Sequence, residues 1–179
     1  MVRPTAHFYA KDHFTSPCAT VPIFRTGLSG AFDDSGNLYV GGLSKFERTQ
    51  IGVIVGGCSA KAILKLTPQY AIKFPSGIQI DTNDNVVILD GSSDQLDIFA
   101  APAKNSRMLF LISTAPLNDT QLGDGLALSS DGKRFYISDW ANHQTEEYAY
   151  PAGGSAIRIL RSNPSCDCEG VGVAPAEFP

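Results

Sequence analysis

The feature that most constrains this chain is a sequence pattern that occurs three times at a constant spacing. The pattern is a short apolar run, a polar turn rich in Asp, Ser, Asn and Gly, and a second apolar run. It covers residues 29–40, 77–88 and 125–137. The apolar residue before the turn is Phe32, Ile80 or Leu128, so the two intervals between successive units are identical. A fixed period of this length indicates that one supersecondary unit is repeated along the chain.

Each repeat is predicted to contain four β-strands. After the two apolar runs that flank the turn, a third and a fourth candidate strand follow. The third strands are predicted at 50–55, 95–100 and 145–150, and the fourth at 61–66, 107–112 and 156–160. Apolar residues nowhere keep a 3.6-residue period over three turns, so almost no helix is expected. A four-stranded propeller blade takes about 40–50 residues, which matches this period and predicts an all-β fold of radially arranged, four-stranded antiparallel sheets.

The repeats predict a single domain, 1–179, with three complete blades at about 29–76, 77–124 and 125–169. Residues 1–28 have the length of two strands, and residues 170–174 provide a first strand, so partial blades are expected at 1–28 and 170–179. We therefore expect a piece of a longer ring, or a ring that a second copy completes. Uncovered blade faces carrying Val, Ile and Phe would favour self-association.

Charge and hydropathy argue against a nucleic-acid partner and against a membrane-spanning helix. The formal net charge is −4, and charged residues make up 18 % of the chain without any run of like charges. A nucleic-acid partner would need a clustered basic face, so none is expected. No apolar stretch approaches the roughly 18 residues of a membrane-spanning helix, so no transmembrane segment is predicted. The first residues also lack the apolar core of a signal peptide.

Several stretches resemble those of a known propeller superfamily. Residues 90–99 and 139–148 resemble the Asp-x-x-Asn-x-x-Ile-x-x-Phe stretch of NHL repeats, and residues 124–139 resemble a blade of the gluconolactonase and TolB-like six-bladed propellers. Residues 150–154 are similar to a strand–turn–strand segment of bacterial extracytoplasmic propellers. The first blade departs most, with residues 41–57 in place of the Asp-x-x-Asn turn. The resemblance implies a periplasmic or secreted bacterial protein.

The candidate ligand positions are the residues just before each first strand, which lie near the mouth of a propeller's channel. They are Leu28, Ser76, Asp124 and Glu169. The carboxylates of Asp124 and Glu169 could hold a divalent cation, Ca²⁺ or Zn²⁺, through oxygen ligands. The gluconolactonase resemblance implies a metal site made of Glu, Asn and Asp, and these two residues match two of its three ligands. The Asn is missing, and both carboxylates can equally be solvated rim residues.

Other polar residues are predicted to be structural, and no catalytic residue is predicted. The turns at 33–37 and 81–85 lack the spacing of calcium loops and are expected to be Asx turns. His143 could pair with Asp139 as a general base, but no nucleophile accompanies it, so a structural hydrogen bond is expected. Trp140 follows a second strand and either caps a blade edge or lines a ligand face.

The four cysteines leave the redox state open. They are Cys18, Cys58, Cys166 and Cys168, which allow three pairings that the sequence cannot distinguish. The spacing of Cys166 and Cys168 is too tight for a zinc site. An even count in a propeller that looks extracytoplasmic favours one disulfide, and buried free thiols are the alternative.

These features predict a non-catalytic propeller module that binds or scaffolds, with a small molecule or a protein at the channel mouth. The alternative from another class is a metal-dependent lactonase of the gluconolactonase type, built on Asp124 and Glu169. A virginiamycin-lyase-like activity follows from fold analogy alone.

Overall fold

The computed structural model describes residues 4–9, 15–103, 106–161 and 170–173, which form β-sheets throughout. Among these residues there is no α-helix, and a 3₁₀ turn at Gly57–Ser59 is the one helical element. No helix of this part of the chain is long and apolar enough to cross a membrane. The predicted all-β class is confirmed.

Three sheets repeat the same strand order, from the inside of the molecule outward, and are called blades 1 to 3. Blade 1 consists of β3 (Thr26–Phe32), β4 (Leu38–Leu43), β5 (Thr49–Ile54) and β6 (Ile63–Pro68). Blade 2 consists of β7 (Pro75–Ile80), β8 (Val86–Asp90), β9 (Gln95–Phe99) and β11 (Leu111–Pro116). Blade 3 consists of β12 (Gly123–Leu128), β13 (Arg134–Asp139), β14 (Gln144–Ala149) and β15 (Gly153–Arg161).

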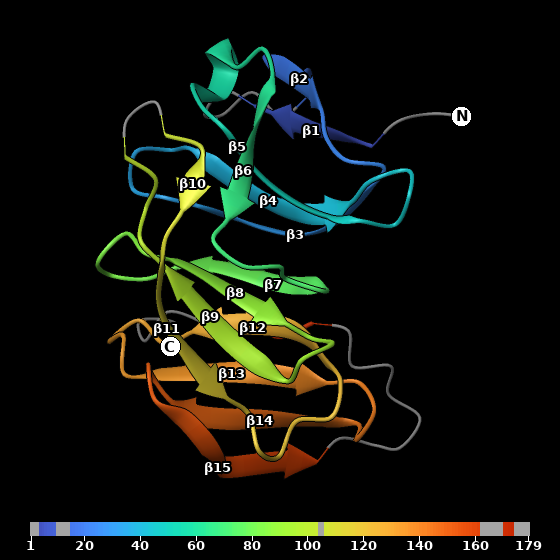
Figure 1. Ribbon diagram of the computed structural model, residues 1–179. Helices are drawn as coiled ribbons and strands as arrows, with labels where there is room; N and C mark the ends of the chain where they lie inside the picture. The colour runs from blue at the N-terminus through green and yellow to red at the C-terminus, as the bar shows by residue number, and fades with distance from the viewer. Residues whose placement is uncertain (1–3, 10–14, 104–105, 162–169, 174–179) are drawn as a thin grey trace.

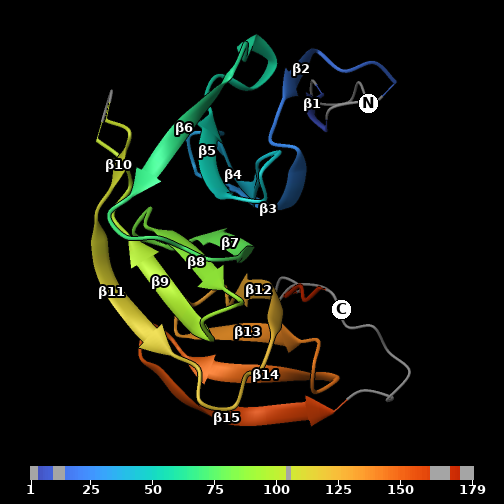
Figure 2. The ribbon, with the colours of Figure 1, turned by 45° about the vertical axis from the view of Figure 1, so that its right-hand side comes forward.

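The three blades stack face to face (Figure 1). The inner strands β3, β7 and β12 lie side by side, and the outer strands β6, β11 and β15 follow the convex side of an arc (Figure 2). The three four-stranded blades predicted from the sequence repeat are therefore present.

The sequence predicts the fourth strand of blade 2 at 107–112, and this is wrong. Met108–Leu109 forms a separate short strand, β10, which pairs in parallel with the end of β6 in blade 1. The chain then turns at Phe110, and β11 pairs antiparallel with β9 from Leu111 onward. The apolar run looks like one strand in the sequence, but its first half crosses to the neighbouring blade, where Leu109 is fully buried.

The core lies between the blades. Residues Val86 to Leu89 of β8 are all fully buried because blade 2 is covered on both faces. Val86 and Ile88 belong to the cluster shared with blade 1, whereas Val87 and Leu89 belong to the cluster shared with blade 3. A strand covered on both faces reads as a continuous apolar run, as this one does.

Two short strands cover the face of blade 1 that is turned away from blade 2. β1 (Thr5–Phe8) pairs antiparallel with β2 (Ala19–Pro22), which agrees with the two strands predicted within 1–28. A disulfide between Cys18 and Cys58 joins β2 to the 3₁₀ turn after β5, with the Cα atoms 5.0 Å apart. A disulfide is therefore present among the described residues, as the sequence led us to expect. Cys166 and Cys168 lie outside the described residues.

The first strand predicted at 170–174 is only partly within the described residues. Residues 170–173 have no strand assignment. They nevertheless lie against β12, because a Cβ added to Gly125 would come within 2.9 Å of the Gly170 Cα. Gly77 of β7 has the same relation to the next inner strand, where a Cβ would come within 2.4 Å of the Leu126 Cβ. The segment thus continues the row of inner strands.

The predicted Asx turns are confirmed. The Oδ1 atoms of Asp33 and Asp81 accept the backbone N–H groups of Asn37 and Asn85, at 2.8 Å in both turns. Blade 3 uses Ser129 at the same place, and its hydroxyl oxygen accepts the backbone N–H of Arg134. Each of these turns joins the inner strand to the second strand of its blade.

Candidate functional site

Each inner strand contains a β-bulge near its start. The register against the second strand shifts between Gly27 and Ser29 in blade 1, between Pro75 and Gly77 in blade 2, and between Gly123 and Gly125 in blade 3. The extra residues are Leu28, Ser76 and Asp124, which are separated by one repeat each. Bulges re-aim side chains and are enriched beside functional sites. Three of the four predicted channel-mouth positions are therefore equivalent, and this side of the molecule is called the bulge end.

Ser76 contributes to packing between blades. Its side chain is buried, and the hydroxyl donates to the backbone oxygen of Gly123 at 2.7 Å. Ser29 makes a similar bond one blade earlier, to the backbone oxygen of Pro75 at 3.1 Å. These two hydroxyls fix each inner strand against the next, so the bulge end is a rigid rim.

Asp124 is the acidic residue among the three bulges. It is half-buried and takes part in a contact within the chain. Glu169 lies outside the described residues, so a site shared by Asp124 and Glu169 stays a prediction. Among the described residues, no group of three or more His, Cys, Asp or Glu side chains is arranged to hold a metal ion.

Two buried aspartates at the bulge end hold the connectors that lead into the inner strands. The Asp90 carboxylate accepts the backbone N–H groups of Lys73 and Phe74, both at 2.9 Å. Asp139 accepts the backbone N–H of Gln121 at 2.9 Å and the side-chain amide of Asn142 at 2.7 Å. These are the first aspartates of the NHL-like stretches, and their carboxylates serve the backbone.

His143, the candidate partner of Asp139, lies in the turn after that residue. Its φ of 52° falls in the left-handed region. The donors to the Asp139 carboxylate include the backbone and side chain of Asn142 and the backbone N–H groups of Gln121, Leu122 and Ala141. The structural hydrogen bond expected for His143 itself stays a prediction.

Sequence reasoning missed a buried carboxylate in the third strand of blade 3. Glu146 is fully buried, and its Oε1 accepts the side-chain amide of Gln144 at 2.6 Å. Its Oε2 accepts the hydroxyl of Tyr148 at 2.8 Å and also that of Thr120. Burial raises the pKa of the Glu146 carboxyl, although these hydrogen bonds act in the opposite direction.

Blade 2 repeats this arrangement with Asp97. The side-chain amide of Gln95 donates to Asp97 at 3.0 Å, and the Thr114 hydroxyl donates at 3.1 Å. The same amide donates to the Tyr70 hydroxyl at 2.7 Å. Burial raises the pKa of the Asp97 carboxyl as well. The available signal was a Gln-x-acid pattern that recurs in the next repeat; in blade 1 the Gln is kept as Gln50, but the acid is replaced by Gly52.

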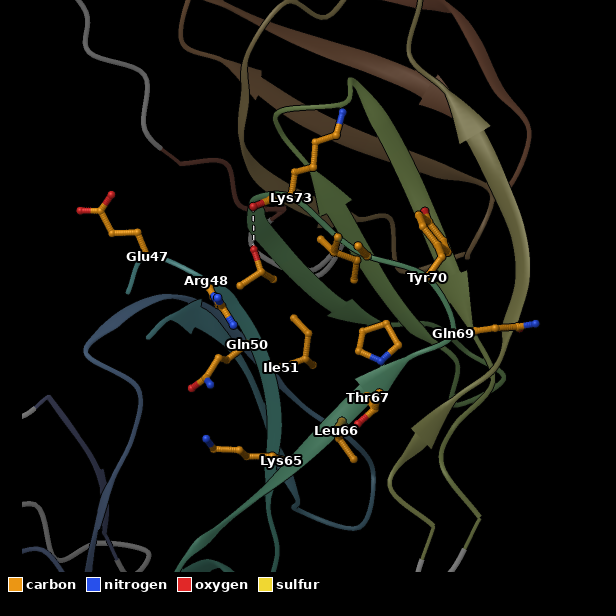
Figure 3. A pocket seen from close by; sticks show the side chains of 14 residues that line it. Glu47, Arg48, Gln50, Ile51, Lys65, Leu66, Thr67, Gln69, Tyr70 and Lys73 are labelled. Atoms are coloured by element: carbon orange, nitrogen blue, oxygen red, sulfur yellow. Dashed lines mark hydrogen bonds between the residues drawn. The ribbon is translucent and has the colours of Figure 1, made fainter. Parts of the chain in front are cut away.

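A groove of about 620 Å³ lies between the outer half of blade 1 and the connector into blade 2 (Figure 3). Tyr70 and Lys73 come from the connector, and the Thr49 hydroxyl donates to the backbone oxygen of Lys73 at 2.6 Å. No bulge residue lines this groove. It is therefore separate from the predicted channel mouth.

Trp140 lies at the bulge end, directly after β13. Its backbone N–H donates to the backbone oxygen of Leu122 at 3.0 Å, and its side chain is 42 % exposed. The equivalent residue of blade 2 is Gly91, where a Cβ would come within 2.2 Å of the Gly123 oxygen. The two roles that the sequence leaves open for Trp140, a cap of the blade edge and a ligand-facing position, both stay predictions.

The comparisons with known proteins identify the fold. No family model and no curated protein matches the sequence. Among solved structures, the chain is similar to a putative 6-phosphogluconolactonase from Bacteroides uniformis, with a TM-score of 0.63, 11 % identity, and coverage of 89 % of this chain and 50 % of that one. It is also similar to a periplasmic gluconolactonase from Pseudomonas aeruginosa, with a TM-score of 0.65, 15 % identity, and coverage of 92 % and 47 %.

A streptogramin B lyase structure gives a TM-score of 0.56, 10 % identity, and coverage of 83 % of this chain and 46 % of that one. The chain thus spans about half the length of the solved structures it matches. The likeness extends over most of the chain and rests on architecture, since so few residues are identical. The chain has the β-propeller fold, in the arrangement found in gluconolactonase and streptogramin B lyase structures.

Proposed function

We propose that the chain is a non-catalytic, NHL- or TolB-like propeller module that binds a ligand at its bulge end. The observation that carries the proposal is the row of three bulges in one register. They present a different side chain from each blade, Leu28, Ser76 and Asp124. Because the Ser76 hydroxyl fixes the backbone of blade 2 to that of blade 3, the rim is preorganised. Trp140 supplies an exposed aromatic surface at the same end.

The hydrogen bonds of the buried carboxylates support a binding role. Asp90 and Asp139 accept backbone N–H groups, and Asp97 and Glu146 accept side-chain donors within the blades. These acids stabilise the fold. Asp124 is the carboxylate of the described bulges, and a carboxylate at the same end as an exposed indole suits recognition of a polar ligand.

The second candidate is a metal-dependent lactonase. Asp124 at the bulge end and the similarity in fold to two gluconolactonases favour it. It would need Glu169 as a further oxygen ligand for Ca²⁺ or Zn²⁺. Leu28 and Ser76, which provide no strong cation ligand, occupy the other two bulges.

Trp140 allows both candidates to be tested in one titration, because it is the sole tryptophan of the chain. D-gluconate and D-glucono-δ-lactone are added with EDTA, Ca²⁺ or Zn²⁺, while indole fluorescence and lactone opening are measured. A binding module should show a saturable fluorescence change in EDTA and open the lactone at the buffer rate. Asp124→Ala should abolish the change, and Asp131→Ala, a fully exposed acid in the turn at the opposite end of β12, should not.

Lactone opening that needs added cation and disappears in Asp124→Ala would replace the binding module by the lactonase. A fluorescence change that survives in Asp124→Ala would place the ligand away from the bulge end.

We further propose an extracytoplasmic location, periplasmic or secreted, and one partial propeller domain over 1–179 with repeats at about 29–76, 77–124 and 125–169. The disulfide between Cys18 and Cys58 supports the location, since such bonds persist in oxidising compartments. Thiol titration of protein made with and without export to an oxidising compartment tests it. Export should protect two more thiols, and equal titration of both preparations would contradict the proposal.

A further inference from the structure

A second concavity, of about 870 Å³, opens on the face of blade 1 that is turned toward β1 and β2. Four cationic side chains line it: Arg25 before β3, Lys45 and Arg48 in the turn between β4 and β5, and Lys65 in β6. No Asp or Glu is among its lining residues. This region is called the blade 1 cation cavity.

Among the described residues, no acidic side chain forms a salt bridge with a cation of this cavity. Within the described ranges, the salt bridges join Arg134 and Arg158 to Glu147, and none involves a cation of the cavity. The nearest acid in sequence is Glu47, which lines the neighbouring groove and points away from Gln50 and Lys65 (Figure 3). A concentration of positive charge is unexpected in a chain with a formal charge of −4.

The other two blades show what this position normally contains. The third strands of blades 2 and 3 bury Asp97 and Glu146, next to Gln95 and Gln144. Blade 1 has Gly52 at this position.

The amide before it is retained as Gln50, and the cross-strand partner of Gly52 is Lys65. Gln50 and Lys65 extend to the same side of β5 and β6 in Figure 3. Blade 1 therefore keeps the amide of this network and has a lysine opposite the position of the acid, while the Ile63 side chain fills the space beside Gly52.

The cavity also has an apolar side. Phe46 is 70 % exposed at its edge, and the Lys45 ammonium lies 4.7 Å from the centre of the Phe46 ring. Phe24 is buried and Ile63 half-buried on the opposite side. An exposed aromatic ring next to several donors is suited to a ligand with one charged and one apolar end.

We propose that the blade 1 cation cavity binds a small organic anion, a carboxylate or phosphate carried on an apolar ring or short chain. The anionic group would be held by Arg48, Lys65 and the Gln50 amide, which line the cavity together. The apolar part would pack against Phe46. Arg25 donates to the backbone oxygen of Lys45 at 3.2 Å, which holds the turn that carries Phe46.

Calorimetric titration with phenyl phosphate, inorganic phosphate and benzyl alcohol tests the two halves of this proposal. Phenyl phosphate should bind at one site, inorganic phosphate more weakly, and benzyl alcohol not at all. The affinity should fall as salt is added, because the cations are exposed. In R48Q/K65Q, the Kd for phenyl phosphate should rise about tenfold or more. The matched control K73Q/K133Q removes two cations outside the cavity and should keep the wild-type Kd.

The Phe46→Ala variant isolates the contribution of the apolar contact. Its affinity for phenyl phosphate should fall, whereas its affinity for inorganic phosphate should stay unchanged. Unfolding midpoints of all variants establish that they fold.

Unchanged affinity in R48Q/K65Q, or equal affinity for phosphate and phenyl phosphate, would overturn the proposal. So would binding of a polyanion such as heparin where phenyl phosphate does not bind. Asp124→Ala should retain phenyl phosphate binding, so the outcome is independent of the function proposed for the bulge end.

Discussion

Three acidic side chains show how burial and nearby hydrogen-bond donors together set the pKa of a carboxyl group. Burial acts to raise the pKa of Asp81, but hydrogen bonds from Tyr150 and Asn85 outweigh it, and the pKa is lowered. In Asp97 and Glu146 burial outweighs the donors, and the pKa is raised. Asp81 lies in a turn at the end of its blade, whereas the other two lie inside a sheet, where the charged form loses more hydration.

The raised pKa of Glu146 predicts how stability depends on pH. A carboxyl that binds its proton more tightly in the folded state contributes stability below its unfolded pKa, and this contribution is lost as pH rises through the folded pKa. Glu146→Gln keeps the shape of the side chain and cannot ionise. The free energy of unfolding of the variant should therefore fall less than that of the wild type as pH rises from 4.5, the ordinary value for Glu, toward neutrality.

Urea unfolding at a series of pH values measures this difference. Parallel pH profiles for the wild type and Glu146→Gln would contradict the burial argument.

At the residue scale, the positions at the bulge end could be predicted from the sequence, whereas the buried acids and the disulfide pairing could not. The bulge positions were predictable, because the repeat spacing alone aligns Leu28, Ser76 and Asp124. Glu146 and Asp97 were not, since an acid in a strand ordinarily reads as a solvent-facing residue. The pairing of Cys18 with Cys58 was not predictable either, because it depends on how β2 folds onto the turn after β5.

At the scale of elements, Gly91 is required for blade 2 to approach blade 3. A Cβ there would lie 2.2 Å from the Gly123 oxygen and 2.7 Å from the Ser76 Oγ. Gly91→Ala should force the two blades apart and lower the free energy of unfolding by roughly 1–3 kcal/mol. Thermal unfolding measures the loss. Gly172→Ala, where no atom lies within 4 Å of the added Cβ, should stay within about 0.5 kcal/mol of the wild type.

The disulfide holds β1 and β2 onto blade 1. It joins residues 40 positions apart, so it shortens a long loop in the unfolded chain. Replacing both partners, Cys18→Ser with Cys58→Ser, should cost roughly 2–4 kcal/mol. The melting temperature should fall by about 5–15 °C. Reduction of the wild type should reproduce this shift, and a reduced protein that melts at the oxidised temperature would show that β1 and β2 are held by packing alone.

Strand order was predictable from the repeat, because each strand pairs with the next along the chain. The displacement of β11 was not, since it depends on β10 crossing to β6 and no local pattern encodes that pairing. The fourth strands of blades 1 and 3 were placed correctly, whereas in blade 2 the crossing of β10 to blade 1 shifts the fourth strand along the chain.

At the scale of the whole molecule, the face of blade 3 that is turned away from blade 2 carries a charged group at a position where Val, Ile or Phe is expected. At equivalent positions, β5 and β9 place Val53 and Ile98 toward the next blade, whereas β14 places Glu147 there. Glu147 is buried and pairs with Arg134 at 2.5 Å and with Arg158 at 2.8 Å. A polar face of this kind resembles that of the capping unit in a repeat protein and disfavours docking of another sheet.

Self-association should therefore depend on Glu147. The exposed ion pairs contribute little stability, because Arg134 and Arg158 are largely solvated. Glu147→Ile should place an aliphatic side chain here, as in blades 1 and 2, and remove the buried charge that disfavours docking. Light scattering over a wide range of concentration should then show the mass of the variant rising above that of one chain, while the wild type stays constant. Glu146→Gln, which changes a side chain that faces blade 2, should behave like the wild type.

A wild-type mass that itself rises with concentration would show association through another surface. Substitution of the exposed Ile157 and Ile159 by Lys would then identify β15 as that surface.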